Sequence, residues 1–297
     1  MTSALAVAHE PRGIVRAPRR PAGWIAPGPR PAGPGSRADG WPASDEDLCY
    51  LCGEWRIFQK LHGHRFSLDD LATAWFACQS VGGRDVRTAL DLGCGSGSVL
   101  LMTAWRFERA RVVGIEAQEV SAGLARRSIE WNGAGDRCAV RHGDLRELEL
   151  GPEEGAFDLV TGTPPYIPLG NGVVSARVQR GPACFELRGG IEDYFAAARR
   201  AVAPGGWAVV CHSDPDRVAV AADRAGLSIA SSRPVVPREG REALFWLFAL
   251  TRERSATPAS ATAALVVRDR DGQWTEEFRA VRRSMGMPCR GSSRGEG

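Results

Sequence analysis

The sequence predicts an α/β fold, in which a mostly parallel seven-stranded sheet is covered by helices on both faces. Apolar strand-like runs alternate with helical patterns from about residue 67 onwards, at the spacing of βαβ units. Two of these runs end in distinctive loops. Residues 89–97 read Ala-Leu-Asp-Leu-Gly-Cys-Gly-Ser-Gly, and residues 157–166 read Phe-Asp-Leu-Val-Thr-Gly-Thr-Pro-Pro-Tyr. Together they indicate a nucleoside cofactor held beside a reactive loop.

The elements follow in order from a capping box. Ser67 and Asp70 open a helix that runs through Leu71, Trp75 and Phe76. Strands are expected over residues 87–92, 111–115, 138–141, 157–161, 207–212, 228–236 and 243–251, and helices over 98–107, 120–131, 192–202 and 216–225. A linker of small residues precedes an added strand at 265–268 and a helix at 275–285.

Three regions are expected along the chain. Residues 1–42 hold six arginines, two acids and many prolines and glycines, a composition that predicts disorder because little apolar surface can be buried. This tail is a passive extension, an organelle transit peptide or an arm that contacts nucleic-acid phosphates. Residues 43–252 form the domain, with a short helical lead-in. Residues 253–297 form a linker, a strand and helix extension, and a disordered end.

Composition restricts the possible functions of the protein only partly. The 297 residues carry a net charge of +3, with one lysine and 37 arginines, which proves no nucleic-acid partner. The eight cysteines and the lack of a secretory leader favour a reducing compartment, so we expect a cytoplasmic protein, or an organellar one if residues 1–42 are a transit peptide. A lone Cys49-x-x-Cys52 lacks a second pair, so no metal is expected. No apolar run approaches 18 residues, so no membrane span is expected.

The candidate cofactor site follows three strands. Gly93 allows the turn after the first strand, while Gly95 and Gly97 let a ligand approach the backbone closely. Asp91 ends that strand, and Glu116 ends the next, 25 residues later, where a carboxylate can accept from ribose hydroxyls. Asp144 ends the third strand, where it can accept from an adenine amine. A fold that binds a nicotinamide dinucleotide is the main alternative for this site. Its glycine-rich turn has the pattern Gly-x-Gly-x-x-Gly, whereas the glycines here are spaced Gly-x-Gly-x-Gly.

The candidate transfer loop follows the fourth strand. Thr163 and the carbonyl of Pro164 are expected to accept hydrogen bonds from an amino group, which localises its lone pair toward an electrophile. Pro165 helps to stiffen the loop, and Tyr166 is expected to stack on a flat acceptor. A rigid surface turn is the alternative.

The acid-x-Gly-x-Gly-x-Gly turn and the Pro-Pro-Tyr loop together resemble the class I S-adenosylmethionine (SAM) dependent methyltransferases, in the branch that methylates planar amino or amide nitrogens. The resemblance implies a Rossmann-like fold and SAM as cofactor. The family's Asn-Pro-Pro-Tyr motif differs here, because Thr163 replaces Asn and offers no amide carbonyl.

Flanking segments resemble bacterial tRNA(Val) adenine-N6 methyltransferases over roughly residues 50–285. These segments are residues 54–59, 63–71, 185–194, 265–269 and 277–279. The resemblance implies an N-methyltransferase acting on adenine in structured RNA, with tRNA as partner. His64 and Arg65 are placed near the cofactor carboxylate or at the substrate entrance, or alternatively pack at the helix start. Arg177, Arg180 and Arg188 are placed to meet phosphate, or alternatively lie in a solvated loop.

Rival functions stay open on the sequence alone. Release-factor glutamine methyltransferases share the Pro-Pro-Tyr loop but usually carry a longer helical substrate domain than residues 43–85 allow. A small-molecule acceptor is the other enzymatic alternative, which the change from Asn to Thr163 keeps open. A SAM-binding scaffold without activity is the third.

Overall fold

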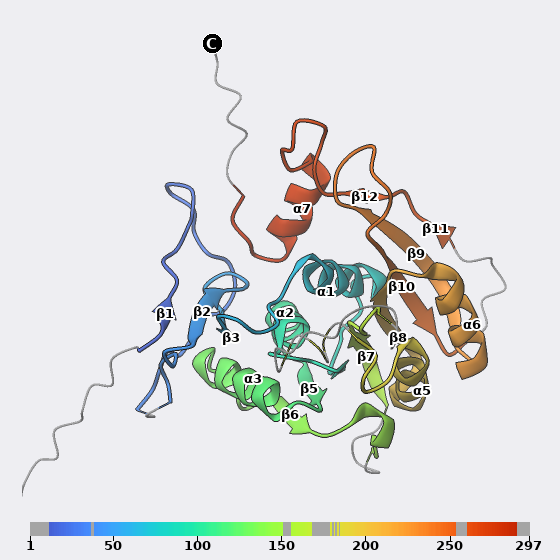
Figure 1. The fold of residues 1–297 in the computed structure, drawn as a ribbon, viewed down its shortest axis with the longest axis horizontal. Helices are drawn as coiled ribbons and strands as arrows, with labels where there is room; N and C mark the ends of the chain where they lie inside the picture. The colour runs from blue at the N-terminus through green and yellow to red at the C-terminus, as the bar shows by residue number, and fades with distance from the viewer. Residues whose placement is uncertain are drawn as a thin grey trace, which may run out of the picture.

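The computed structural model describes residues 12–36, 39–150, 156–167, 179, 181, 183, 185–253 and 260–289. Within them the main sheet has nine strands in the order β11-β9-β10-β8-β7-β4-β5-β6, with β12 paired to β9 (Figure 1). The seven expected strands are β4 (Thr88–Leu92), β5 (Arg111–Glu116), β6 (Cys138–His142), β7 (Phe157–Gly162), β8 (Val202–His212), β9 (Ser228–Val236) and β10 (Phe245–Thr251). Two two-residue strands, β11 (Ser260–Ala261) and β12 (Leu265–Val266), extend its edge.

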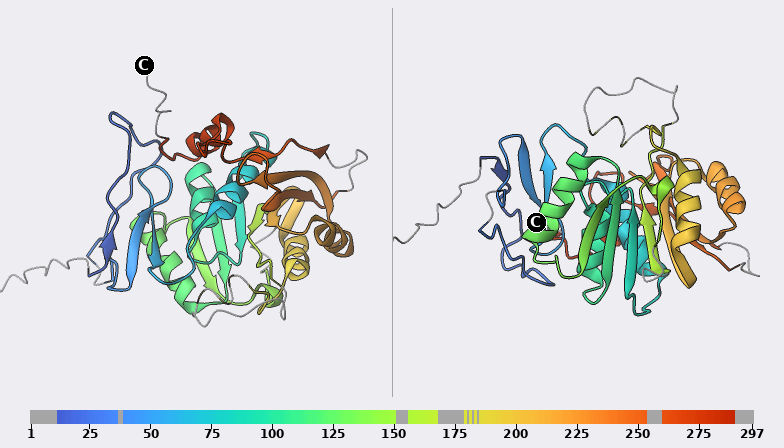
Figure 2. Two further views of the ribbon diagram at one scale, coloured as in Figure 1. Left: turned by 45° about the horizontal axis from the view of Figure 1, so that its top comes forward. Right: turned by 90° about the horizontal axis from the view of Figure 1, so that it is seen from below.

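The sheet is mostly parallel, as expected, with β10 antiparallel to both of its neighbours. One face is covered by α1 (Leu68–Ser80), α2 (Ser98–Arg106) and α3 (Glu119–Trp131), and the other by α5 (Ile191–Ala201) and α6 (Pro215–Ala225) (Figure 2). Successive strand residues point to opposite faces of the sheet. Ala89 and Val112 pack in the apolar layer under α1, α2 and α3, whereas Leu90 and Val113 pack in the layer under α5 and α6. A short 3₁₀ turn, η1 (Leu145–Glu147), follows β6, and α7 (Glu276–Ser284) packs on α1.

Two local features explain element boundaries. The capping box of α1 is present: the Ser67 amide donates to the Asp70 carboxylate at 2.8 Å. Strand β8 begins at Val202, five residues earlier than expected, because Val202 pairs with Phe157 and a register shift absorbs the Pro-Gly-Gly segment. Gly206 is required there, since a Cβ would lie 2.9 Å from the Phe157 carbonyl oxygen.

The expectation of a disordered segment over residues 1–42 is wrong for the described part of that segment. Strand β1 (Ile14–Val15) pairs in parallel with β2 (Glu46–Tyr50), which forms an antiparallel hairpin with β3 (Arg56–Lys60). The region before β4 therefore contains a small three-stranded sheet in addition to helix α1. Arg16 donates to Asp47 at 2.8 Å, and Arg20 donates to Glu54. These strands could not be predicted from the sequence, because ion pairs between arginines and acids hold the segment in place and no apolar periodicity marks it.

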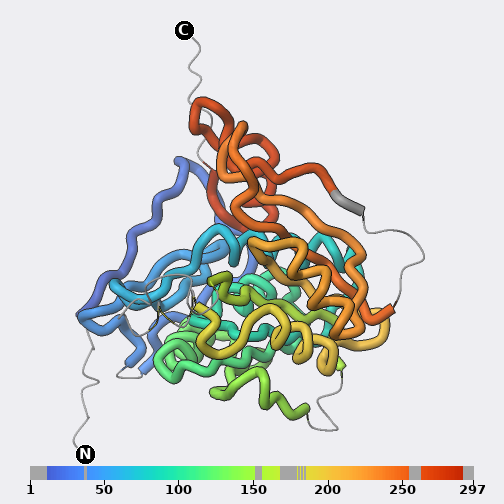
Figure 3. The backbone as a smooth tube through the Cα atoms, turned by 45° about the vertical axis from the view of Figure 1, so that its right-hand side comes forward, coloured from blue at the N-terminus to red at the C-terminus, as the bar shows by residue number. Residues whose placement is uncertain are grey.

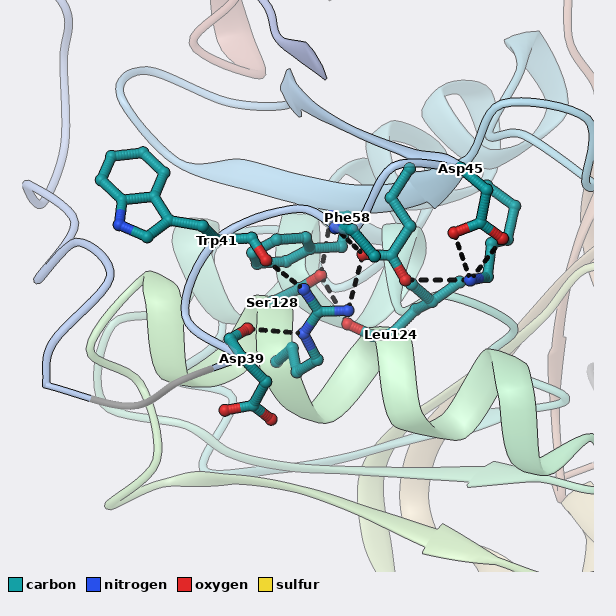
Figure 4. Close-up of polar contacts among 10 residues, drawn as sticks. Asp39, Trp41, Asp45, Phe58, Leu124 and Ser128 are labelled. Atoms are coloured by element: carbon teal, nitrogen blue, oxygen red, sulfur yellow. Dashed lines mark hydrogen bonds and ion pairs between the residues drawn. The ribbon is translucent and has the colours of Figure 1, made fainter. Parts of the chain in front are cut away.

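Arg127 of α3 joins this N-terminal region to the main domain (Figure 4). Its guanidinium donates to the carbonyls of Asp39 and Trp41 at 3.0 and 2.9 Å and to the Glu46 carboxylate at 2.7 Å. It also lies 4.2 Å from the centroid of the Phe58 ring. One side chain thus satisfies the backbone of a segment that has few apolar contacts of its own.

Trp105 of α2 brings both terminal regions together. Its ring lies close to Gly28, Gly53 and Gly286, and the Gly53 amide donates to the Gly286 carbonyl at 2.8 Å. Figure 3 traces the N-terminal segment in blue and the C-terminal extension in red. The N-terminal segment and the C-terminal extension are therefore parts of one packed structure with α2.

Candidate functional site

The carboxyl ends of four parallel strands bring the candidate residues to one edge of the sheet. In register, Asp91 pairs with Gly114 and Thr161, and Glu116 pairs with His142. The strand order reverses between β4 and β7, so their connections run to opposite faces and leave a crevice at this edge. A pocket opens there, lined among others by Gly93, Gly95, Glu116, Asp144, Thr163 and Pro165.

The glycine-rich turn has the conformation that the sequence predicts. Gly93, Gly95 and Gly97 have φ of 61°, 56° and 89°, in the left-handed region. A Cβ on Gly93 would collide with the Tyr194 hydroxyl, and one on Gly97 would lie 3.2 Å from the Ala125 Cβ. A Cβ added to Gly95 would have nothing within 4 Å, so the pocket reaches this side of its backbone directly.

Glu116 supports this turn from the end of β5. One carboxylate oxygen accepts from the Gly95 amide at 2.8 Å and the other from the Gln118 amide at 2.7 Å. Burial raises the pKa of Glu116, although these backbone bonds and nearby Arg188 oppose the shift. Each oxygen keeps a lone pair, so the side chain retains capacity to accept from ligand hydroxyls.

Two further buried carboxylates, Asp91 and Asp70, lie near the glycine-rich turn. Asp91 accepts from the Thr161 hydroxyl at 2.8 Å through one oxygen, while its other oxygen has no hydrogen-bond partner among the described residues. Asp91 does not line the pocket itself. Asp70, which the sequence assigned only to the capping box, does line it and accepts from the Ser98 hydroxyl at 2.7 Å. Burial raises the pKa of each to about 7.

Asp144 lies in the pocket wall but is engaged by a neighbour. Its carboxylate accepts from the Arg146 guanidinium at 2.6 and 3.0 Å and from the Arg146 amide at 2.9 Å. The hydrogen bonds to Arg146 lower the pKa of Asp144. An adenine amine would share this carboxylate with Arg146.

The transfer loop is only partly as expected. Thr163 and Pro165 line the pocket, whereas Pro164 is buried and does not. Tyr166 also lies outside the pocket. Its hydroxyl lies 2.8 Å from the Cys211 sulfur, and its ring packs edge-on to His212, with centroids 5.5 Å apart. The expectation that Tyr166 stacks on an acceptor does not match this orientation, because the ring is used to fix the loop on β8.

Several secondary candidates separate in space. His64 and Arg188 line the pocket, and Arg188 donates to the Ala117 carbonyl at 2.5 Å. Arg65 instead donates two hydrogen bonds to Asp47. Arg177 and Arg180 lie outside the described residues.

Sequence reasoning missed Phe66 and Tyr194 as lining residues. Phe66 lies just before the capping box, and Tyr194 on the first turn of α5. Their signal was their position at helix starts beside the sheet edge.

Comparisons with known proteins agree with this geometry. A family described as a methyltransferase domain matches residues 89–168. A tRNA1(Val) (adenine(37)-N6)-methyltransferase of Porphyromonas gingivalis is 33% identical over 104 residues, which are 34% of this chain and 41% of that protein. A release factor glutamine methyltransferase of Geobacter sulfurreducens is 34% identical over 128 residues, 41% of this chain and 43% of that one.

A third relative acts on a small molecule. The 4-amino-L-phenylalanine/4-methylamino-L-phenylalanine methyltransferase of Streptomyces pristinaespiralis is 33% identical over 155 residues, 49% of this chain and 51% of the relative. The chain thus spans about half or less of the length of these relatives. A solved structure described as a predicted O-methyltransferase from Agrobacterium tumefaciens shares the fold, with a TM-score of 0.55 and 20% identity over 75% of this chain and 99% of that one.

The described residues also bear on two other features, a metal site and a membrane-spanning helix. Within the described ranges, no group of three or more His, Cys, Asp or Glu side chains is placed to hold a metal ion. No helix among the same residues is long and apolar enough to cross a membrane. The family match, the sheet order and the glycine-rich turn at the switch point agree with one another: residues 89–168 carry a methyltransferase domain of the SAM-dependent kind.

Proposed function

We propose that this protein transfers a methyl group from SAM to an amino nitrogen, with the exocyclic amine of adenine in structured RNA as the favoured acceptor. The observation that carries the proposal is one pocket that contains both the glycine-rich turn and the start of the transfer loop. Gly95 and Glu116 lie in one wall, and Thr163 and Pro165 in another. A cofactor and an acceptor bound there are held next to each other.

The residues present fit SAM. The open backbone at Gly95 leaves room for a ligand, and the Glu116 oxygens can accept from ribose hydroxyls. Behind the turn, one oxygen of the buried Asp91 side chain has no hydrogen-bond partner among the described residues, so it is available to a ligand or to water. SAM supplies an electrophilic methyl group on a sulfonium.

On the acceptor side, the chain orients the amine. The Thr163 hydroxyl can accept one N–H, which draws the nitrogen lone pair toward the methyl donor. Pro164 and Pro165 are buried and hold that hydroxyl on a stiff loop. Asp70 lies in the same pocket with its pKa raised by burial, so near neutral pH it is able to take up the proton that the methylated nitrogen loses.

The relatives support the nitrogen acceptor as a class. Adenine N6, the glutamine amide and the aromatic amine in the printed names are all nitrogens with delocalised lone pairs. Glutamine methylation of a protein and methylation of an aromatic amine are therefore the competing candidates. The wealth of arginine over lysine favours RNA among the three, because the guanidinium fork matches phosphate.

The test is methyl transfer from radiolabelled SAM to three acceptor pools: total RNA, total protein and amine metabolites. We expect label in RNA, recovered as N6-methyladenosine after digestion to nucleosides. Label confined to protein glutamine or to a small amine would replace adenine as acceptor but keep the methyltransferase. No label in any pool, together with intact SAM binding, would favour a non-catalytic scaffold.

The cofactor assignment has its own test. Glu116→Ala removes the acceptors for Gly95, Gln118 and the ligand, so SAM affinity should fall at least about tenfold, or about 1.4 kcal/mol. Glu116→Gln is the matched control, because it keeps one acceptor oxygen, and it should lose less. Unchanged SAM affinity by calorimetry in folded Glu116→Ala would refute the assignment.

A further inference from the structure

A second, larger cavity lies outside the pocket just described. It has a volume of about 990 Å³ and is walled by the N-terminal segment, the start of α1 and the C-terminal extension. Phe66 lines both cavities, so they adjoin at the entrance to α1. Both terminal regions are needed to form it, because Ile14 to Arg20 line one side and residues 286–288 another.

The charged side chains that line this cavity, among the described residues, are all positive. Its lining includes six arginines, and no described lining residue is acidic; the arginines are Arg16, Arg19, Arg20, Arg65, Arg268 and Arg282. Asp47 engages two of them and Glu54 a third. Arg19, Arg268 and Arg282 have no carboxylate partner among the described residues. An anionic ligand would supply the missing charge.

Arg282 shows this most clearly. Its side chain is half-buried on α7 and donates to the Pro288 carbonyl at 3.2 Å, while its buried Nε has no partner among the described residues. A buried cation without a counter-ion is costly, so a bound anion would stabilise it.

Flat aromatic surfaces accompany the arginines. The Arg282 guanidinium lies 4.2 Å from the Trp274 ring centroid, and Trp274 meets Phe278 edge-on with centroids 6.0 Å apart. Tyr50 and Phe66 belong to the same lining. Arginines bind phosphates, and aromatic rings stack with bases, so this combination suits a nucleotide better than an acidic peptide.

We propose that this cavity binds a nucleotide of a single-stranded RNA segment that flanks the methylated base. The inference rests on the proposed function, and it names the surface that holds the substrate. Phosphate lies against Arg19, Arg268 and Arg282, and a base stacks in the aromatic part of the lining. The shared wall at Phe66 then sets the neighbouring base at the transfer pocket.

The experiment measures binding of the full chain to a 5′-labelled 12-nucleotide single-stranded RNA by fluorescence anisotropy at several salt concentrations. The double variant Arg19→Gln/Arg268→Gln should raise Kd at least tenfold. Its plot of log affinity against log salt should become shallower by about 1.4, since each phosphate contact in single strands contributes about 0.7. Trp274→Ala should also raise Kd, and Trp274→Phe should restore most of the affinity.

The matched control is Arg111→Gln/Arg224→Gln, which removes two exposed arginines far from the cavity lining. It should change Kd less than twofold, and SAM affinity should be unchanged in every variant. Equal losses in both arginine pairs would show diffuse charge and overturn the proposal, as would unchanged RNA binding in the cavity variant.

The two proposals fail separately. If wild type methylates RNA but the cavity variants bind and methylate it normally, the cavity assignment is wrong and the function stands. If the cavity variants lose RNA binding but no adenine is methylated, the cavity assignment stands and the acceptor is wrong. A phosphopeptide that binds through the same residues, while RNA does not bind, would also overturn the proposal.

Discussion

Thr163 is the residue at which this chain departs from the Asn-Pro-Pro-Tyr motif that its transfer loop resembles, and its position in the pocket makes the departure testable. Threonine offers one hydroxyl oxygen and no amide carbonyl, so its hold on an amine is weaker. If the acceptor is an adenine or amide amine, Thr163→Asn should preserve or raise the methylation rate, and Thr163→Ala should lower it. Initial rates on the RNA acceptor measure this. A lower rate for Thr163→Asn would instead indicate an acceptor to which threonine is adapted.

Tyr166 should behave as a residue that positions the loop. Tyr166→Phe removes only the contact with the Cys211 sulfur and should cost about 0.5–1.5 kcal/mol of stability. Tyr166→Ala also leaves a cavity beside His212 and should cost about 3 kcal/mol. Denaturant unfolding gives both values. If Tyr166→Ala kept full stability but lost acceptor binding, the ring would be a stacking surface after all.

The buried acids predict an unusual pH dependence of stability. Asp70 and Asp91 have a pKa of about 7 in the folded protein, raised by burial, and about 4 when unfolded. The folded state therefore holds more protons between these values, so the free energy of unfolding should fall as pH rises from about 4 to 7. Urea unfolding at pH 5, 6, 7 and 8 measures it.

Asp91→Asn is the control for this slope, because it keeps the acceptor for Thr161 and removes the titration. Its stability should vary less over the same window. Asp144 acts in the opposite direction, since its pairing with Arg146 lowers its pKa and its contribution is lost only below about pH 4. A stability that rises steadily from pH 5 to 8 would contradict the assignment of buried, protonated acids.

Residue-scale prediction from sequence succeeds where a local pattern fixes the backbone. The left-handed glycines and the acids at strand ends follow from short motifs, and the structure gathers Gly93, Gly95, Glu116 and Asp144 as expected. The direction of a side chain depends on what packs around it. For that reason the burial of Tyr166 against β8, and the entry of Asp70 into the pocket, were not visible in the sequence.

At the scale of elements, the N-terminal segment differs most from expectation. The α/β alternation was predictable because each strand and helix carries its own apolar period. Strands β1, β2 and β3 lack that signal, since their order depends on partners far along the chain, such as Arg127 with the Asp39 and Trp41 carbonyls. Composition therefore suggested a disordered tail over residues 1–42, where the structure has strand β1, and a helical lead-in after residue 42, where it has β2 and β3.

Deletion of residues 1–36 should consequently destabilise the protein. It removes β1 and the Arg16 and Arg20 ion pairs, leaving buried Asp47 with Arg65 alone. We expect Tm to fall by more than about 4 °C, because even 1 kcal/mol shifts Tm by about 2–4 °C at this size. Deletion of residues 1–11 is the control and should leave Tm unchanged. An unchanged Tm for the longer deletion would restore the interpretation as a passive tail.

At the scale of the whole molecule, Trp105 couples the two ends of the chain. Gly286 has φ of 64°, and a Cβ there would lie 2.5 Å from two carbons of the Trp105 ring. Gly286→Ala should therefore displace the C-terminal turn, lower Tm and weaken RNA binding, while SAM affinity stays unchanged.

Gly240→Ala is the matched control for Gly286→Ala. Gly240 has a similar φ of 79°, but a Cβ added there would have nothing within 4 Å. The substitution therefore costs only backbone strain. The difference in Tm between the two variants measures the contact with Trp105. Equal effects of both substitutions would show that the contact carries no energy beyond that strain.

The convergence of both ends on α2 also sets an order of events during synthesis. A ribosome makes the chain from its N-terminus, and residues 14–20 emerge long before residues 267–288. The arginine-rich wall of the second cavity therefore lacks its other half until residues 267–288 have been made. A nascent chain halted before α7 already contains the glycine-rich turn but lacks Phe278, Arg282 and residues 286–288 of the cavity lining, so we expect it to bind RNA more weakly than the full chain.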